Sequence, residues 1–264
     1  MPSDTTDEQL SLVASRLRSA ASVVVLTGAG VSAESGLRTF RGATSADLPP
    51  DMRTLWAEFD PAKLATPEAF QADPAMVTKW YDWRRLGCLA AEPNPGHLAL
   101  AAMEHALRRR GVDFTLLTQN VDRLHQRAGS SNVVELHGSI IQWRCTETGT
   151  TLTPPPEPMQ RFPPPSPFAP GALLRPDVVW FGETLPELAI ATAVDALQRC
   201  DLFMSIGTSA VVHPAAGFIE IAAAVGAFLA EINAEATPVS RRVDVSVRGS
   251  SANILPKIVQ ASQP

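Results

Sequence analysis

Short apolar runs recur along the chain, separated by longer stretches in which apolar and polar residues mix. The runs are rich in β-branched residues, and the intervals between them can hold the helical crossovers that join parallel strands. Helices on both faces of such a sheet would bury it completely. The pattern predicts an α/β fold, a doubly wound parallel Rossmann-like sheet, with strands at Val23–Thr27, Phe114–Thr118, Val133–Leu136, Leu202–Gly207, Ala227–Ile232 and Val243–Val247.

Two regions interrupt this rhythm and predict a small second domain. The first, residues 43–86, places Trp56, Trp80, Tyr81 and Trp83 among helix-forming residues, which indicates a helical insertion. The second, residues 143–171, is so rich in proline that neither a helix nor a central strand can persist there, because proline lacks the amide hydrogen.

We therefore expect three segments, 1–42, 87–142 and 172–264, to form the main domain. The helical insertion and an extended, partly mobile proline-rich excursion would form the small one.

Composition narrows the class of protein. Of the 264 residues, 45% are hydrophobic and 19% charged, and no apolar run approaches the roughly 20 residues that cross a bilayer, so we expect no membrane partner. A net charge of -5 argues against a broad attraction to nucleic acid. The residues before Val23 lack the basic start and apolar centre of a secretory signal, which predicts a cytoplasmic location. Three widely spaced cysteines do not suggest a disulfide framework.

A glycine-rich turn, GAGVSAESG at residues 28–36, follows the first strand. Glycines at such a turn let the backbone approach a pyrophosphate at a helix N-terminus. The third glycine comes six residues after the second rather than three, so a tight turn without a ligand is an open alternative. Arg38 and Arg41 lie just beyond, where one could reach phosphate, or where both could form a solvated basic loop.

Polar residues also end the next two strands. Asn120 and Asp122 follow the second strand, where they could contact a ligand in the crevice of the sheet or cap the next helix. His137 ends the third strand, and an imidazole pKa near 6.5 suits proton transfer near neutrality. A lone histidine is more often structural, and we interpret His125, on a predicted helix, in that way.

Taken together, these motifs resemble the signatures of the sirtuin family. The matches are GAG-x-S-x-x-SG-x-x-x-FR at 28–41, TQN-V-D-x-LH-x-x-AG at 118–129, ELHG at 135–138, GTS at 207–209 and INAE at 232–235. They extend from Val23 to about Ser251, nearly the whole chain. The resemblance implies an NAD-dependent protein-lysine deacylase that consumes NAD as a co-substrate and yields nicotinamide and O-acyl-ADP-ribose.

The resemblance also implies residue roles. His137 would be the general base, and Asn120 and Asp122 would act with it by holding the nicotinamide end of NAD. The other residues implied to bind the cofactor are Gly28, Ala29, Gly30, Ser32, Ala33, Phe40, Arg41, Gln119, Gly207, Thr208, Ser209, Asn233, Glu235 and Ser251.

The substrate side of the site has two similarities to the family. Residues Val179, Trp180 and Phe181 resemble the segment that pairs with an acyl-lysine peptide. Tyr81 and Arg84, three residues apart on one helical face, resemble the Y-x-x-R of class III sirtuins, which remove malonyl, succinyl and glutaryl groups. A guanidinium can bind a carboxylate through two parallel hydrogen bonds. Removal of acetyl groups could persist, and the pair could instead be an interfacial aromatic beside a surface arginine.

The chain departs from the family at the structural zinc. Most sirtuins carry two cysteine pairs there. Cys145 matches the first ligand, but Thr148 stands in place of the second, and residues 163–171 contain no cysteine. Because a tetrahedral site of this type needs four thiolates, we expect no zinc, with the prolines restricting the module instead.

Three other classes of function remain as alternatives. NAD cleavage could feed an ADP-ribosyltransferase reaction, which would place label from NAD on protein. The chain could also be a non-catalytic NAD or ADP-ribose binding module, although His137 and Asn120 are both present. A hydride-transferring dehydrogenase on a similar sheet would release no nicotinamide.

Overall fold

The computed structural model describes residues 3–37 and 61–263 and contains a six-stranded parallel sheet in the order β3-β2-β1-β7-β8-β9. All six predicted strands are present, with ends within two residues of those expected. Their bounds are β1 Ser22–Thr27, β2 Asp113–Thr118, β3 Val133–Glu135, β7 Leu202–Ile206, β8 Phe228–Asn233 and β9 Val245–Arg248. The prediction of a doubly wound α/β fold is confirmed.

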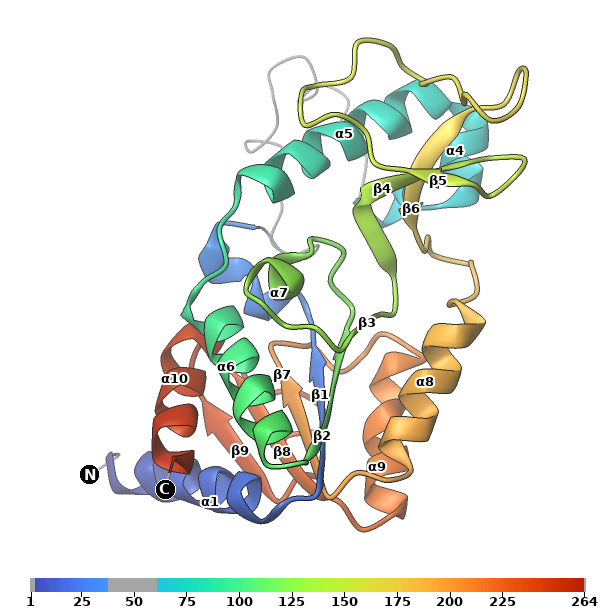
Figure 1. Cartoon of the computed structure of the whole chain (residues 1–264). Helices are drawn as coiled ribbons and strands as arrows, with labels where there is room; N and C mark the ends of the chain where they lie inside the picture. Colours follow the sequence, from blue (N-terminus) through green and yellow to red (C-terminus); the bar gives the residue numbers. More distant parts are fainter. Residues whose placement is uncertain (1–2, 38–60, 264) are drawn as a thin grey trace.

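Helices cover both faces of this sheet (Figure 1). One face carries α1 (Ser3–Ser19), α6 (Pro95–Arg109) and α10 (Ser251–Ser262), and the other carries α8 (Glu187–Leu197) and α9 (Phe218–Ala224). Alternate residues of β1 point to opposite faces, so Val23 and Val25 pack on the first side and Val24 and Leu26 on the second. Burial on both faces explains why the strands are continuous apolar runs.

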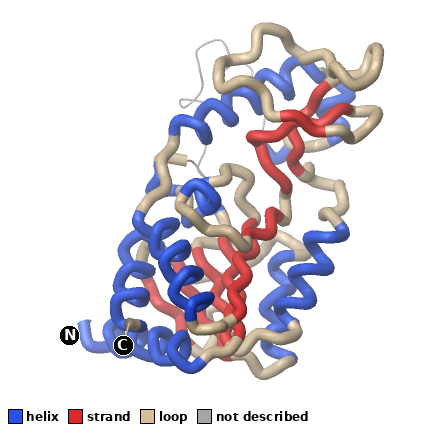
Figure 2. Tube along the Cα trace, in the orientation of Figure 1, coloured by secondary structure: helices blue, strands red, loops and turns tan. Residues whose placement is uncertain are grey.

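A second, antiparallel sheet in the order β5-β4-β6 lies beside α5 and away from the two termini (Figure 2). Its strands are β4 (Gly138–Cys145), β5 (Thr151–Leu152) and β6 (Leu174–Val178). Three helices belong to this region, α3 (Pro61–Leu64), α4 (Pro67–Ala72) and α5 (Pro74–Ala90). A separate core joins them, built around Trp80, Tyr81, Trp143 and Trp180.

Residues 143–171 contain no helix, as predicted, but the expectation that no central strand persists there is wrong at its start, because β4 continues to Cys145 and pairs with β6, and β5 follows. Beyond β5 the prolines begin, and there the described chain forms one isolated bridge, Pro165 to Leu173. The expected domain boundaries at 86 and 142 fall inside α5 and β4, because both elements continue into the small module's core. Otherwise the division into two domains stays an interpretation.

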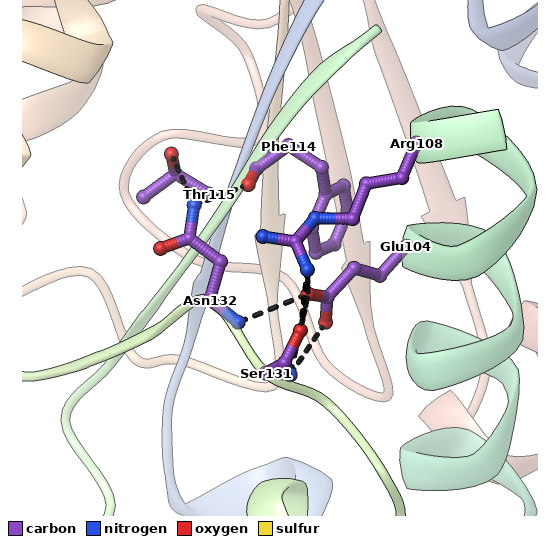
Figure 3. Close-up of polar contacts among 6 residues, drawn as sticks. All are labelled: Glu104, Arg108, Phe114, Thr115, Ser131 and Asn132. Atoms are coloured by element: carbon purple, nitrogen blue, oxygen red, sulfur yellow. Dashed lines mark hydrogen bonds and ion pairs between the residues drawn. The ribbon is translucent and has the colours of Figure 1, made fainter. Parts of the chain in front are cut away.

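A buried carboxylate fixes the loop that leads into β3 (Figure 3). Glu104 on α6 is fully buried and accepts hydrogen bonds from the backbone N–H groups of Ser131 at 3.0 Å and Asn132 at 2.9 Å. Asn132 in turn donates from Nδ2 to the carbonyl of Phe114 on β2 at 2.6 Å. The loop is therefore held on both sides just before β3, the strand that leads to His137.

The remaining short elements connect the strands near the sheet's carboxyl edge. They are the α-helix α7 (Leu124–Arg127) and the 3-10 turns η1 (Ala29–Val31), η2 (Ala33–Ser35) and η4 (Ala215–Gly217). In the described part of the chain, no helix combines the length and apolar character needed to cross a membrane.

Candidate active site

The glycine turn after β1 packs backbone to backbone against the turn after β7. Gly30 N donates to the Gly207 carbonyl at 2.8 Å, and Gly28 N donates to Ile206 O at 3.1 Å. A Cβ on Gly30 would lie 2.7 Å from Gly207 O, so no side chain fits there without moving backbone. Ala29 and Ala33 are exposed on this turn.

Ser32, which ends the first short turn of this loop, connects it to the segment after β2. Its hydroxyl donates to Asp122 Oδ2 at 2.7 Å and accepts from Asn120 Nδ2 at 3.1 Å. Asp122 also accepts the Leu124 N–H through Oδ1 at 2.9 Å, so it contacts both Ser32 and the first residue of α7. Burial raises the pKa of Asp122, against the hydrogen bonds from Leu124 and Ser32, which lower it.

His97 is a buried member of this network that the sequence analysis missed. Its Nδ1 accepts the Asn94 N–H at 3.2 Å, which leaves Nε2 as the donor to Ser32 Oγ at 3.3 Å. Burial lowers the pKa of His97 to about 4, so the ring is neutral at pH 7. A signal for it exists in NPGH at 94–97, an N-cap asparagine and an N1 proline with histidine at the third helical position.

His125 lies behind this network. Its Nε2 is hydrogen-bonded to Thr27 Oγ1 at 3.0 Å, and its ring centroid is 4.9 Å from that of His97. Burial, assisted by His97, lowers the pKa of His125 to about 3. These contacts agree with a structural interpretation of His125.

His137 lies between the two sheets, after β3 and immediately before β4. Its Nδ1 donates to the Gln119 carbonyl at 2.9 Å, so in the neutral ring Nε2 carries the lone pair that can accept a proton. Burial lowers the pKa of His137, and the bond to Gln119 acts in the opposite direction. The next residue, Gly138, has φ of 72°, and a Cβ there would lie 2.2 Å from Asp177 O on β6.

The ends of β7 and β8 complete this edge of the sheet. Gln119 Nε2 donates to Thr208 Oγ1 at 3.1 Å, and Asn233 Nδ2 donates to Thr208 O at 2.9 Å. The hydrogen bonds therefore link residues at the carboxyl ends of four parallel strands, β1, β2, β7 and β8, and the bond from His137 to the Gln119 carbonyl adds the end of β3.

Besides Ala29 and Ala33, three more predicted cofactor residues take part in none of these bonds. Ser209 is half-buried, and the Glu235 side chain is exposed. Ser251, at the start of α10, is buried, and its Oγ has no hydrogen-bond partner within the described ranges. Phe40 and Arg41 lie outside the described residues.

The predicted substrate segment runs beside His137. Val179 N donates to His137 O at 3.0 Å, and Phe181 N donates to Ala65 O at 2.9 Å. Trp180 between them is buried, whereas Phe181 has half of its surface exposed. Val179 is half-buried.

Tyr81 and Arg84, the pair predicted to bind the acyl group and called the acyl pair below, lie close together beside this segment. The Tyr81 ring is buried 6.2 Å from that of Trp180, and burial raises the pKa of Tyr81 to about 12. Arg84 Cζ lies 5.4 Å from the Tyr81 ring centroid and 4.8 Å from that of Trp80. The phenol and the guanidinium therefore share one helical face, as their spacing predicts.

The residues present fit a dinucleotide but do not fit a structural zinc ion. Glycines that allow close backbone approach, together with a buried serine hydroxyl free to bond, suit a dinucleotide across the sheet edge. For zinc, the first ligand position holds Cys145, whose pKa the Ser166 and Thr148 side chains lower to about 7 through hydrogen bonds. One thiol with two hydroxyls does not fit a four-thiolate site, and no group of three or more potential ligands occurs among the residues described.

Comparison with known proteins agrees with this geometry. The Sir2 family profile matches residues 28–214. An "NAD-dependent protein deacylase 2" of Pyrobaculum aerophilum is 46% identical over 248 residues, which cover 94% of each chain. A solved Sir2 homolog–NAD complex is 41% identical, with a TM-score of 0.84 over 95% of this chain and 93% of that one.

A second solved structure, a Sir2 variant with a deacetylated p53 peptide and 3'-O-acetyl ADP ribose, is 28% identical. Its TM-score is 0.80 over 95% of this chain and 97% of that one. The chain belongs to the Sir2 family, the sirtuins. It is an enzyme of the NAD-dependent protein deacylase type, with NAD as its co-substrate.

Proposed function

We propose that this deacylase prefers lysine acyl groups that end in a carboxylate, of the succinyl, malonyl and glutaryl type, and also accepts acetyl. The observation that carries the proposal is the convergence of Tyr81 and Arg84 beside Trp180, whose chain neighbour Val179 bonds to His137. An acyl chain that extends from the catalytic edge toward Tyr81 would meet a phenol and a guanidinium. Both groups can donate hydrogen bonds to a carboxylate.

Within the site, we assign the chemistry to groups at the carboxyl edge of the sheet. NAD bound there would supply the ribose carbon to which the acyl oxygen bonds, with nicotinamide as the leaving group. His137 would take a proton from a ribose hydroxyl through Nε2, with Nδ1 held by Gln119 O. Asn120 and Asp122, oriented through Ser32, would hold the nicotinamide end of NAD. The remaining residues of the glycine turn and of the β7 and β8 ends would bind the rest of the cofactor.

Replacing Arg84 with methionine should reduce kcat/KM for succinyl-lysine peptides far more than for acetyl-lysine peptides. One charge-assisted hydrogen bond contributes about 1.5–3 kcal/mol, so the succinyl-to-acetyl ratio should fall about 10- to 150-fold. Mass spectrometry of acetyl-, succinyl- and glutaryl-lysine peptides incubated with NAD measures the ratio. Arg84→Lys keeps the positive charge but cannot donate two parallel hydrogen bonds. Its succinyl-to-acetyl ratio should therefore lie between those of the wild type and Arg84→Met.

Equal losses on both peptides would overturn the acyl preference. The same assay tests the reaction class, because deacylation releases nicotinamide and O-acyl-ADP-ribose. Transfer of the ADP-ribose mass to peptide or protein would instead support the ADP-ribosyltransferase alternative.

We also infer that the enzyme is active without a structural zinc ion. The support is the donor set around Cys145, which offers a single thiol. Purified protein should contain well under about 0.1 equivalents of zinc by elemental analysis, and a strong chelator should leave the unfolding temperature unchanged, since no metal contributes to folding. About one equivalent of zinc would contradict this.

A further inference from the structure

Next to the acyl pair on α5 lies a second pair of residues that the proposed function leaves unexplained. Asp82 and Arg85 are 2% and 0% exposed, and Arg85 Nη2 is 2.7 Å from Asp82 Oδ1. The Arg85 Nε donates to the same oxygen at 2.8 Å. Burying an ion pair costs free energy unless the remaining donors and acceptors are satisfied.

The remaining atoms of the pair are satisfied by the proline-rich excursion, which lies 70 to 77 residues further along the chain. Arg85 Nη1 and Nη2 donate to the carbonyls of Pro155 and Glu157, each at 2.8 Å. Asp82 Oδ2 accepts the Met159 N–H at 3.0 Å. Proline offers no amide hydrogen for regular pairing, so tertiary bonds of this kind must determine where the segment lies.

The same segment packs against the core that contains the acyl pair. Met159, whose backbone bonds to Asp82, packs its side chain on the cluster that includes Trp80, Tyr81 and Trp180. On α5 the pair Asp82 and Arg85 lies one residue further along than the pair Tyr81 and Arg84. The two members of each pair are three residues apart. Successive residues are about 100° apart around a helix, so any rotation of α5 that moved Asp82 and Arg85 would also move Tyr81 and Arg84.

We propose that Asp82 and Arg85 are positioning residues for acyl selectivity: they bind α5 to residues 155–159 and thereby hold Arg84 over Tyr81. The inference rests on the proposed function of Tyr81 and Arg84. In most sirtuins the corresponding stretch is bracketed by zinc-binding cysteines, as the resemblance implies, and here a buried ion pair makes the connection.

The test measures the succinyl-to-acetyl ratio of kcat/KM and the KM for NAD in Arg85→Met, Arg84→Met and the double variant. Arg85→Met should lower the ratio by up to about 10²-fold and by no more than Arg84→Met does, because a misplacement of about 1 Å can cost that order of activity, and it should leave the KM for NAD within about twofold. The double variant should show no further loss of ratio beyond Arg84→Met, because both changes remove the same interaction.

Two further variants keep the test informative. Arg85→Lys retains the positive charge beside Asp82, so we expect it to fold even if Arg85→Met does not, and it should give a ratio between those of the wild type and Arg85→Met. Arg199→Met, which removes an exposed ion pair with Asp195 on α8, should leave the ratio unchanged.

The outcomes separate the two proposals. If Arg84→Met lowers the ratio but Arg85→Met and Arg85→Lys slow both peptides equally, the pair is merely structural and the positioning role is overturned. An additive loss in the double variant would also overturn it. If Arg84→Met itself leaves the ratio unchanged, the acyl preference fails, and the selectivity role of the pair fails with it.

Discussion

Replacing His137 with alanine should lower kcat about 10²- to 10⁴-fold, the range that a positioned general base contributes, and leave the affinity for NAD within about twofold. The reason is the orientation of the His137 ring. Because Nδ1 donates a hydrogen bond to Gln119 O, Nε2 is the nitrogen that can accept a proton. Gln119 keeps its separate bond to Thr208, so the cofactor side of the cleft should persist. Single-turnover kinetics and calorimetric NAD titration measure the two quantities.

A matched control is His105→Ala, since His105 is an exposed histidine on α6. It should change neither quantity. Because burial lowers the pKa of His137, wild-type activity should decline with acidity only below about pH 6.5, the ordinary value for the ring. Turnover of His137→Ala within about tenfold of the wild type would remove His137 as the general base.

The six strands of the main sheet could be predicted from the sequence because each is buried on both faces. A strand such as β1 must then be apolar at every position, and such a run is easily recognised. Their parallel order places all carboxyl ends at one edge, which is why motifs after β1, β2 and β7 converge as expected.

The antiparallel sheet was not predicted, and the reason lies in its strands. The β4–β6 register shifts between Ser139 and Trp143, which disturbs the alternation of apolar and polar residues in β4. Pro176 lies within β6, where proline normally argues against a strand. Trp143 on β4 packs in one core with Leu174 and Val178 on β6, a contact between distant parts of the chain that no local pattern indicates.

Buried polar residues were the other omission. His97, Glu104 and Arg85 are of residue types that usually lie on the surface. Their hydrogen-bond partners are far away in the sequence: Ser32 is 65 residues from His97, and Pro155 is 70 residues from Arg85. No local pattern reports such a distant hydrogen bond, although burial without one would be unstable.

The free energy of unfolding should fall by about 4 kcal/mol between pH 7.5 and pH 5, owing to His97 and His125. Burial lowers their folded-state pKa values to about 4 and about 3, so both rings are neutral in the folded enzyme at pH 5. Their unfolded-state pKa is about 6.5, so the unfolded chain binds nearly two more protons at that pH. Stability therefore decreases as pH falls through 6.5 and continues to decrease down to the folded-state values.

Two other groups at the site change how steeply the free energy of unfolding depends on pH. His137, whose pKa is also lowered, adds in the same direction, whereas Asp122, whose pKa is raised, favours the folded state as pH falls. Urea denaturation at half-unit intervals of pH measures the balance. His97→Gln should flatten the slope by about one proton between pH 5 and pH 6.5, and His105→Gln, at an exposed position, should leave it unchanged.

A stability that is constant over this range would contradict neutral, buried histidines behind the cleft. The expected decrease in stability would mean that the same histidine affects stability and NAD binding. Protonating His97 removes its Nδ1 acceptor and breaks the hydrogen bond from the Asn94 N–H. Loss of that bond releases the ring that supports Ser32, and Ser32 holds both Asn120 and Asp122. The residues proposed to bind nicotinamide should therefore lose their orientation when His97 is protonated in the folded enzyme, so the KM for NAD should rise near pH 4 rather than near pH 6.5.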